Sequence, residues 1–302
     1  MSFRATIPDE LVTHTIAMCG GRGERWLDEL PAVIRELESQ WSVTVGDPFP
    51  AIEFNYVAGA TGKNDQPLVI KIGPPFDDSE IFSEAKFLKV LNGRGTIKLL
   101  ALDRVRRSIL LERAMPGENL AELFTGNELG AIEPAIELLQ FITHEPPKDL
   151  TDTISLDDWF DGLRRYSETD FPKSYAERAL GIYGDLSVKG SYRYLHGDFH
   201  PGNVVSATRE RFLAIDPKGI VGPIGYDIAV FLNNFHWWQE ERADIKERLD
   251  QAVRKFAESF DIDEYDLRCW AFAQMVLGAW WTFVEMPDIY QNEVAKADVW
   301  DI

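Results

Sequence analysis

The chain has 302 residues, with 50 Asp and Glu against 31 Lys and Arg, so its formal net charge is -19 at pH 7. A surface this acidic repels phosphate backbones and anionic headgroups, which excludes nucleic acid and anionic membranes as main partners and favours cationic small molecules. Hydrophobic residues make up 45% of the chain and aromatic residues 12%, which excludes global disorder. The length predicts about two domains or lobes.

Cysteine content and hydropathy point to the cytoplasm. Cys19 and Cys269 are too few for a disulfide framework or a thiolate metal cluster. The N-terminal stretch 1–11 has no apolar core of the kind that a signal peptide needs. The longest uncharged apolar run, 269–284, is shorter than the roughly 18–20 residues of a membrane span, so we expect a buried helix there.

The first third of the chain predicts a β-rich lobe. Apolar residues spaced by three and four predict an amphipathic helix over 24–41. Short β-rich runs within 42–72, broken by glycines and turn residues, predict an antiparallel meander. Helical spacing returns over 79–91, and two further strands follow within 97–113.

The rest of the chain predicts a larger helical lobe. Amphipathic helices are expected over 118–143, 155–166, 173–184 and 225–302, and short strands over 192–195 and 212–215. The two strands form an isolated hairpin within the helical part. We therefore expect a domain of residues 1–114 followed by a domain of residues 115–302.

The stretch 194–219 contains the pattern that suggests chemistry. His196-x-Asp198 is followed by Asn203, and Asp216 ends the next apolar strand. Two oxygen ligands together with substrate phosphates are the usual way in which proteins hold Mg²⁺. A further carboxylate can accept a hydroxyl proton, so the set fits phosphoryl transfer from Mg·ATP.

Other interpretations of these residues exist. Any one of them can simply mark a loop, but the joint pattern favours a site. His196 suits either acid–base chemistry or a structural brace, and the brace is favoured. A zinc site of His196, Asp198 and His200 is possible in principle, but Pro201-Gly202 argues against the helix that would pair the two histidines.

Lys71 is a charged residue within an apolar strand, so it needs a partner or a ligand. Glu84 on the following helix can pair with it; the alternative is a surface lysine and a solvated glutamate. The turn 59–62 could cover phosphates, although any hairpin turn can be rich in glycine. The run 20–23 lacks the Lys-Ser/Thr of a P-loop.

Three segments carry a resemblance to a known family: LLERAMPG at 110–117, LHGDFHPGNVV at 195–205 and AIDPKGIVGPIGYDIA at 214–229. They resemble the aminoglycoside phosphotransferase branch of the protein-kinase-like superfamily, and within it the streptomycin 6-kinase and aminoglycoside/hydroxyurea resistance kinases. The resemblance implies an α+β bilobal protein-kinase-like fold. That fold has a small antiparallel β lobe with a helix and a larger, mainly helical lobe.

The resemblance also implies roles for residues on both lobes. Asp198 corresponds to the catalytic base or hydroxyl positioner, and Asn203 and Asp216 to the Mg²⁺ ligands. Lys71 corresponds to the lysine that binds the ATP phosphates, and Glu84 to its partner on the helix.

Further positions correspond to supporting parts of the family's site. Residues 112–115 resemble the hinge, so backbone groups of Glu112 and Ala114 are expected to pair with adenine. Asp227 resembles the helix aspartate that supports the catalytic loop, which agrees with the preference for a carboxylate at a helix N-terminus. Lys218 either approaches the phosphates or only closes a turn, and both interpretations stay open.

The acceptor is expected to be a hydroxyl of a small cationic molecule, an aminoglycoside or amino sugar such as streptomycin. Residues 240–302 hold 15 acidic residues against seven Lys and Arg, which suits either a cationic ligand or, as the favoured interpretation, a solvated face. The pairs Trp237-Trp238 and Trp280-Trp281 can stack on a sugar ring, but core positions are favoured.

Two other functions compete with a small-molecule kinase. One is a catalytically weak nucleotide-binding regulatory protein on the same fold, which the presence of lysine, base and both metal ligands disfavours. The other is a protein kinase, which is disfavoured because no Ala-Pro-Glu follows Asp216.

Overall fold

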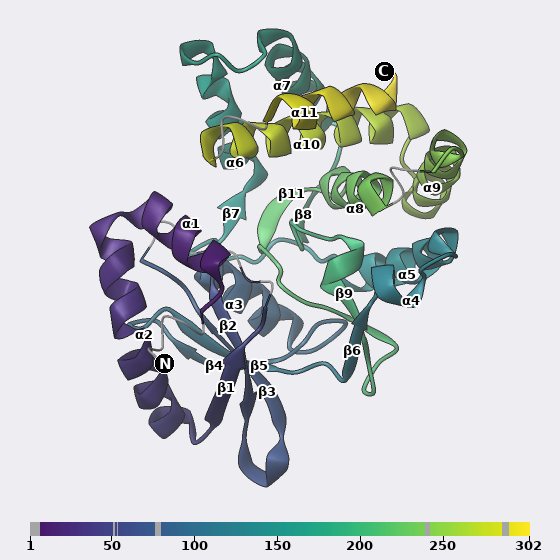
Figure 1. The fold of residues 1–302 in the computed structure, drawn as a ribbon. Helices are drawn as coiled ribbons and strands as arrows, with labels where there is room; N and C mark the ends of the chain where they lie inside the picture. The colour runs from purple at the N-terminus through teal and green to yellow at the C-terminus, as the bar shows by residue number, and fades with distance from the viewer. Residues whose placement is uncertain (1–6, 51, 53, 76–79, 239–241, 286–289) are drawn as a thin grey trace. The chain divides into compact units, whose positions relative to one another are not determined.

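A computed structural model describes residues 7–50, 52, 54–75, 80–238, 242–285 and 290–302 of the chain (Figure 1). Contacts divide the chain into two compact units, Met1–Gly117 and Glu118–Ile302.

Unit 1, Met1–Gly117, is built on a five-stranded antiparallel sheet in the order β1-β2-β3-β5-β4 (Figure 1). Its described elements are α1 (Asp9–Cys19), α2 (Gly21–Trp41), β1 (Thr44–Pro48), β2 (Tyr56–Thr61), the 3-10 turn η2 (Lys63–Asp65), β3 (Pro67–Ile72), α3 (Glu80–Leu91), β4 (Leu99–Asp103) and β5 (Ser108–Glu112). The expected meander is present in β1 to β3, but β3 pairs with β5 because α3 intervenes before β4.

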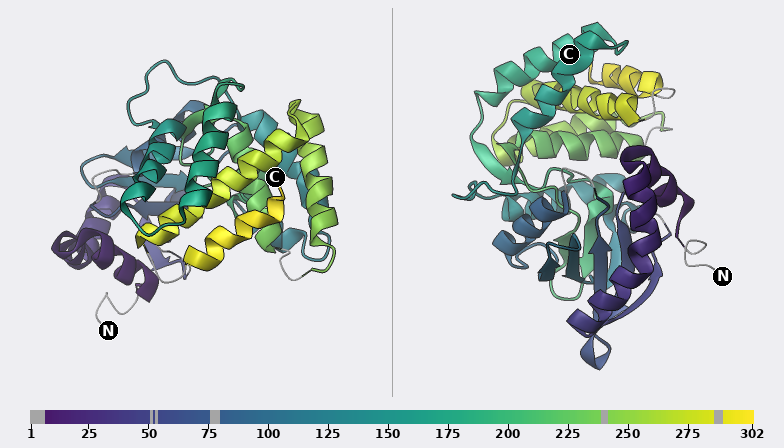
Figure 2. Two further views of the ribbon diagram at one scale, coloured as in Figure 1. Left: turned by 90° about the horizontal axis from the view of Figure 1, so that it is seen from above. Right: turned by 90° about the vertical axis from the view of Figure 1, so that its left-hand side faces the viewer.

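Alternation along β3 assigns the two faces of this sheet. Ile70 and Ile72 belong to the same apolar cluster as the inward face of α2. That face repeats at helical spacing and consists of Leu27, Leu30, Ile34 and Leu37. Because side chains alternate in a strand, Lys71 lies on the opposite face, where it meets α3. The right-hand view of Figure 2 shows α1 and α2 beside the strands.

Helix α1 was not expected from the sequence, because its apolar residues form only a weak stripe. It packs closely on α2 at a glycine: a Cβ on Gly23 would lie 2.4 Å from the backbone oxygen of Thr15. Leu11 of α1 is fully buried in the cluster that joins α2 to the sheet. The close crossing therefore depends on a residue without a side chain.

Unit 2, Glu118–Ile302, is mainly helical (Figures 1 and 2). After β6 (Pro116–Asn119), its described elements are α4 (Leu120–Leu123), η3 (Glu128–Ala131), α5 (Ile132–Ile142), β7 (Ile154–Ser155), α6 (Leu156–Leu163), η4 (Arg164–Glu168), α7 (Lys173–Ser187), β8 (Tyr192–Leu195), η5 (Pro201–Asn203), β9 (Val204–Ala207), β10 (Phe212–Ala214), β11 (Ile220–Pro223), α8 (Gly225–Trp238), α9 (Ile245–Phe260), α10 (Glu264–Glu285), α11 (Tyr290–Ala295) and η6 (Lys296–Trp300).

Two small sheets lie among these helices, in the orders β10-β9-β6 and β7-β11-β8. Strands β9 and β10 form an antiparallel hairpin in which Ala214 pairs with Val204. Strand β11 pairs antiparallel with β8, so that Ile220 lies opposite Leu195. Of these strands only β8 and β10 were expected. The expected hairpin between them is wrong, because β8 pairs with β11 and β10 pairs with β9, in two different sheets.

The expected single helix over 118–143 is wrong, because this stretch divides into α4, η3 and α5. Asn119 starts α4 with a reciprocal capping box to Glu122. Gly126 then has a φ of 82°, which a helix cannot continue through. Thus turn and cap residues, rather than apolar periodicity, set the element boundaries here.

The C-terminal helices enclose the core of unit 2. Helix α10 packs against α8, α7 and α11, and α10 and α11 lie side by side in the left-hand view of Figure 2. Trp300 is 1% exposed and donates Nε1–H to Asn233 Oδ1 of α8 at 2.8 Å. Asn233 Nδ2 in turn donates to the carbonyl of Ala271 in α10 at 2.9 Å. Among the helices that the structure describes, α10 included, we find none long and apolar enough to cross a membrane.

Replacing Trp300 by Ala should therefore destabilise unit 2 by about 3–5 kcal/mol, because it opens a cavity and leaves Asn233 Oδ1 unpaired. Trp300→Phe keeps most of the buried area and should cost less than the alanine variant. Urea unfolding of both variants measures the difference. Equal stabilities of wild type and Trp300→Ala would show that this anchor is unimportant.

Candidate active site

The fully buried carboxylate of Asp227 holds the loop that follows β8. Asp227, in the first turn of α8, accepts the backbone N–H of His196 at 2.8 Å through Oδ2 and that of Gly197 at 2.7 Å through Oδ1. Burial raises the pKa of Asp227 to about 7, against the lowering effect of these two hydrogen bonds. The geometry matches the supporting role that the family resemblance implies for this residue.

The His196 side chain braces the same loop, and both of its ring nitrogens are engaged. Nε2 lies 2.9 Å from the carbonyl oxygen of Ile215, and Nδ1 lies 3.3 Å from the backbone nitrogen of Asp198. These partners fit a neutral imidazole that donates through Nε2 and accepts through Nδ1. Burial lowers the pKa of His196 to about 3. The geometry therefore supports the structural interpretation of His196 over acid–base chemistry.

Gly197 allows the chain to turn between His196 and Asp198. Its φ of 84° lies in the region that glycine tolerates best, and a Cβ there would lie 3.0 Å from Lys218 Cβ. Lys218 donates its backbone N–H to the His196 carbonyl at 2.7 Å. The loop is thus joined to the 216–219 segment by main-chain contacts.

Asn203 orients Asp198 from the base of the β9–β10 hairpin. Its Nδ2 donates to the Asp198 carbonyl at 3.0 Å and to Asp198 Oδ2 at 3.3 Å. His200 shapes the intervening turn, since its Nδ1 accepts the Gly202 N–H at 3.1 Å, and its Nε2 lies 3.9 Å from Asp198 Oδ2. The Asp198 side chain is 33% exposed. A partly exposed carboxylate on a braced loop is accessible to a reacting group.

The hairpin also brings Asp216 to the same end as Asn203. Ile215 donates its N–H to the Asn203 carbonyl at 2.9 Å, directly below the last ladder pair. Asp216 has a φ of 56°, which is uncommon for a residue with a side chain and is better tolerated by Asp than by most. Because Asn203 Nδ2 is committed to Asp198, its Oδ1 remains the atom suited to a cation. These hard-oxygen donors fit Mg²⁺.

The alternative zinc site gains no support. His196 uses both ring nitrogens within the loop, and His200 Nδ1 accepts a backbone N–H. Within the described ranges, no group of three or more His, Cys, Asp or Glu side chains is arranged to hold a metal ion.

In unit 1, the structure joins Lys71 and Glu84. Lys71 Nζ lies 2.6 Å from Glu84 Oε2, and the two residues are only 6% and 3% exposed. Lys71 is the last residue but one of β3, the central strand of the sheet, and lies opposite Val57 and Ile109 in the neighbouring strands. The interpretation of a surface lysine with a solvated glutamate is therefore wrong. A buried ion pair of this kind fixes the ammonium in one place.

The segment expected to pair with adenine follows β5. Glu112 donates its N–H to the Lys98 carbonyl at 2.9 Å, and its Oε2 accepts the Lys98 N–H at 3.0 Å. Ala114 lies in a tight turn, since a Cβ on Gly117 would be 2.9 Å from the Ala114 carbonyl oxygen. The Glu112 N–H is thus already paired within unit 1.

The suggested phosphate-covering turn at 59–62 is not supported. Gly59 lies within β2, where it pairs with Val69 of β3. Gly62 lies in the β2–β3 hairpin and donates its N–H to the Gln66 carbonyl at 2.9 Å. Gly59 instead allows a close approach by Arg113, whose Nη1 would lie 3.1 Å from a Cβ at this position.

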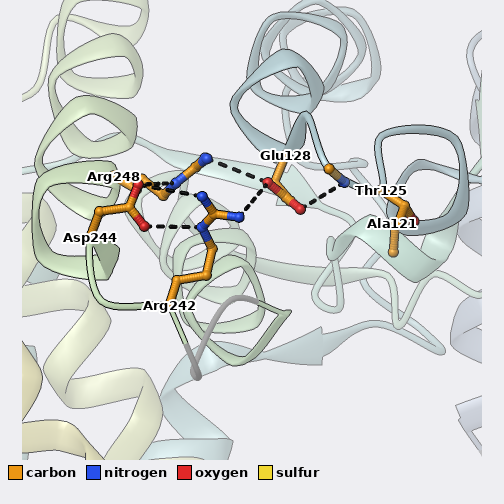
Figure 3. A network of polar contacts seen from close by, with 7 residues as sticks. Ala121, Thr125, Glu128, Arg242, Asp244 and Arg248 are labelled. Carbon is orange, nitrogen blue, oxygen red and sulfur yellow. Dashed lines mark hydrogen bonds and ion pairs between the residues drawn. The ribbon is translucent and has the colours of Figure 1, made fainter.

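Many acids of the C-terminal stretch are paired with cations of unit 2. Asp244 contacts both Arg242 and Arg248 at 3.0 Å, and both arginines approach the buried Glu128 (Figure 3). Further pairs are Asp250 with Arg268, Asp266 with Lys189, Glu293 with Lys296 and Asp301 with Lys246. Glu240, Glu241 and Asp288, and the side chain of Glu285, lie outside the described part. These pairs favour the interpretation of a solvated ionic face.

The tryptophan pairs have different environments. Trp280 is 3% exposed and packs edge-to-face on Phe171, so it belongs to the core. Trp281 is half-buried and meets Trp159 of α6 in a T-shaped contact with ring centroids 5.2 Å apart. The side chains of Trp237 and Trp238 lie outside the described part.

Comparison with known proteins gives the family context. A model described as aminoglycoside/hydroxyurea antibiotic resistance kinase matches residues 56–285. The chain is 24% identical to a streptomycin 6-kinase of Streptomyces glaucescens over 288 residues, which cover 91% of this chain and 90% of that relative. It is 25% identical to a hydroxyurea phosphotransferase of Kitasatospora aureofaciens, over 97% of this chain and 85% of that one.

A solved structure shows the same fold. It is a thermostable mutant of aminoglycoside phosphotransferase APH(4)-Ia, in a ternary complex with ADP and hygromycin B. It matches with a TM-score of 0.61 at 15% identity and covers 89% of this chain and 97% of that one. The expected protein-kinase-like fold, with an antiparallel sheet in unit 1 and a mainly helical unit 2, is therefore confirmed.

The buried neutral His196 predicts a specific pH dependence of stability. In the unfolded chain His196 takes up a proton near pH 6.5, whereas in the folded protein it does so only near pH 3. Neutral His196 therefore stabilises the folded protein at neutral pH, and this contribution is lost as the pH falls below about 6.5. Between pH 7 and pH 5 the loss should be about 2 kcal/mol relative to His196→Gln, which cannot take up this proton. Asp227 is present in both proteins, so its own titration largely cancels.

Urea unfolding of wild type and His196→Gln at pH 5, 6 and 7 measures this difference. The stability advantage of the wild type should shrink steadily towards pH 5. A constant difference across this range would show that His196 takes up its proton at the same pH in the folded protein as in the unfolded chain.

Proposed function

The chain belongs to the aminoglycoside/hydroxyurea antibiotic resistance kinase family, a family of small-molecule kinases, and on that premise we propose that it transfers the γ-phosphoryl group of Mg·ATP to a hydroxyl of a small molecule. The observation that carries the proposal is the loop after β8. It presents Asp198 beside Asn203, and the hairpin closes with Asp216 at the same end.

Asp198 accepts the hydroxyl proton of the acceptor in this mechanism. The acceptor oxygen forms a bond to the γ-phosphorus while the bond from phosphorus to the bridging oxygen breaks. ADP leaves with that electron pair, and the proton passes to the Asp198 carboxylate. Asn203 orients this carboxylate through Nδ2, and Asp227 holds the loop that carries it.

Asn203 and Asp216 would hold the Mg²⁺ ion through Oδ1 and the carboxylate, respectively. When bound, the ion supplies charge neutralisation on the phosphate oxygens. In unit 1, Lys71 would bind the ATP phosphates. Glu84 holds the Lys71 ammonium in place, with its Oε2 2.6 Å from Lys71 Nζ. Glu112 and Ala114 remain the proposed contacts to adenine, through backbone groups other than the Glu112 N–H.

For the acceptor, we propose a cationic aminoglycoside or amino sugar of the streptomycin type. The names of the two relatives support a small hydroxyl-bearing acceptor, and the net charge of -19 favours a cation. The paired acids of residues 240–302 do not add to this support. The two cysteines are buried and free, which suits the proposed reducing cytoplasm.

Asp198→Asn should reduce kcat by at least about a thousandfold, because the amide cannot accept the hydroxyl proton. The side chain keeps its shape, so unfolding stability and ATP affinity should change little. A coupled ADP-release assay with streptomycin, other aminoglycosides, hydroxyurea and amino alcohols measures the turnover. Asp161→Asn changes an exposed carboxylate of α6 that pairs with Arg164; it is the matched control and should remain active.

Retention of most of the wild-type kcat by Asp198→Asn would contradict the assignment of the base. ATP binding by the wild type without ADP release for any acceptor would instead favour the alternative of a nucleotide-binding regulatory protein.

Variants of the Lys71–Glu84 pair can separate its effect on stability from its effect on nucleotide binding. Lys71→Met should destabilise unit 1 by about 3–5 kcal/mol, because Glu84 is left as an unpaired buried charge. The double variant Lys71→Met/Glu84→Gln removes both charges and should recover much of that stability. Both variants should bind ATP at least about tenfold more weakly than the wild type.

Calorimetric ATP titration together with urea unfolding measures the two effects. If the double variant regains wild-type ATP affinity along with its stability, Lys71 has no part in binding phosphate.

A further inference from the structure

Lys218 stands in a segment that the catalytic loop holds firmly. Its backbone N–H donates to the His196 carbonyl at 2.7 Å, and the following Gly219 donates to the same oxygen at 3.2 Å. Its Cβ lies beside Gly197, where an added methyl group would approach to 3.0 Å. The residue is therefore positioned two places after Asp216 and against the residue that precedes Asp198.

Closing this turn requires only the main chain of residue 218. Any residue with a backbone N–H could donate to His196, so the turn does not account for a lysine. The neighbours Pro217 and Gly219 are buried, whereas Lys218 is only half-buried. Of these three residues, Lys218 alone keeps a partly exposed surface, and it is the one with a long cationic side chain.

The charges around this segment make a cation at position 218 notable. Residues 195–229, all of which the structure describes, contain three cations: Arg209, Arg211 and Lys218. The β9–β10 register places the two arginines near the hairpin tip, where Phe212 pairs with Ser206, whereas Lys218 follows its base. The Lys218 ammonium and the Asp216 carboxylate also act in opposite directions on the pKa of His196, which agrees with an ammonium close to the loop.

We propose that Lys218 is a further catalytic residue, whose ammonium contacts the γ-phosphoryl oxygens of ATP. This inference rests on the proposed function and adds to it a cation from the Asp-Pro-Lys-Gly segment of unit 2. Lys218 stays protonated throughout. As the acceptor oxygen bonds to phosphorus and the bond to the bridging oxygen breaks, the ammonium offsets the negative charge of the transferred group. The proton of the acceptor still passes to Asp198.

If Lys218 contacts the γ-phosphoryl group and no other part of the nucleotide, its loss should weaken the binding of ATP analogues but not that of ADP. Lys218→Met should weaken the binding of a non-hydrolysable ATP analogue at least about tenfold, while ADP affinity stays within about twofold of wild type. Both are measured by calorimetry of the full chain in the presence of Mg²⁺. The kcat of Lys218→Met should fall by about a hundredfold or more, as for the loss of one donor to a developing charge.

Two further variants complete the test. Lys218→Arg keeps a cation and should retain more of the analogue affinity than Lys218→Met. Arg211→Met removes a cation from the other end of the same hairpin and should leave affinity and kcat unchanged. Thermal unfolding of each variant verifies that the fold is retained.

Equal weakening of ADP and analogue binding in Lys218→Met, or no change in either, would overturn the proposal. Failure of Lys218→Arg to exceed Lys218→Met in analogue affinity would also overturn it. If the wild type binds neither nucleotide, the proposed function itself fails, and this outcome is distinct from the others. The binding measurement needs no turnover, so it remains decisive before the acceptor is known.

Discussion

The chemistry proposed for this protein depends on the Asp227 carboxylate, which is fully buried in unit 2. A buried carboxylate is costly unless its oxygens are satisfied, and here each oxygen accepts one backbone N–H of the loop that leads to Asp198. The two hydrogen bonds offset part of this cost, and they form only when His196 and Gly197 adopt this one conformation. The His196 side chain adds two further contacts, to the Ile215 carbonyl oxygen and to the Asp198 backbone nitrogen. The position of Asp198 follows from contacts made by its neighbours.

In each unit, a buried charge with its partners fixes the position of the residues that we propose to act on ATP. In unit 2, the β9–β10 hairpin brings Asn203 and Asp216 to one end, and the 216–219 segment returns to the loop through the His196 carbonyl. In unit 1, the central strand β3 holds Lys71 in place, and Glu84 of α3 pairs with it out of contact with water. Preorganised charges of this kind are what phosphoryl transfer requires, because the protein supplies position and neutralisation more than covalent chemistry.

The residues that the sequence singled out for a site are those whose chemistry is unusual for their surroundings, and their roles stay a prediction. Lys71 is a charge in an apolar strand, and Asp198, Asn203 and Asp216 have a spacing that loops rarely produce. The family resemblance supplied the fold class, which the comparisons confirm. The pairing of C-terminal acids with cations was not predictable, because partners such as Asp266 and Lys189 lie far apart in the chain. Helix α1 and the division of residues 118–143 depend on a close crossing at Gly23 and a positive φ at Gly126, which leave no periodic signal.

Hydrogen–deuterium exchange of Asp227→Asn tests the central claim most directly, that this carboxylate holds the loop that leads to Asp198. The amide nitrogen of Asn cannot accept an N–H, so one of the two loop hydrogen bonds is lost. The His196 and Gly197 amides should exchange much faster than in the wild type, while α10 and the sheet of unit 1 keep their protection. Unchanged exchange at these two amides, or equal loss of protection throughout unit 2, would contradict the claim.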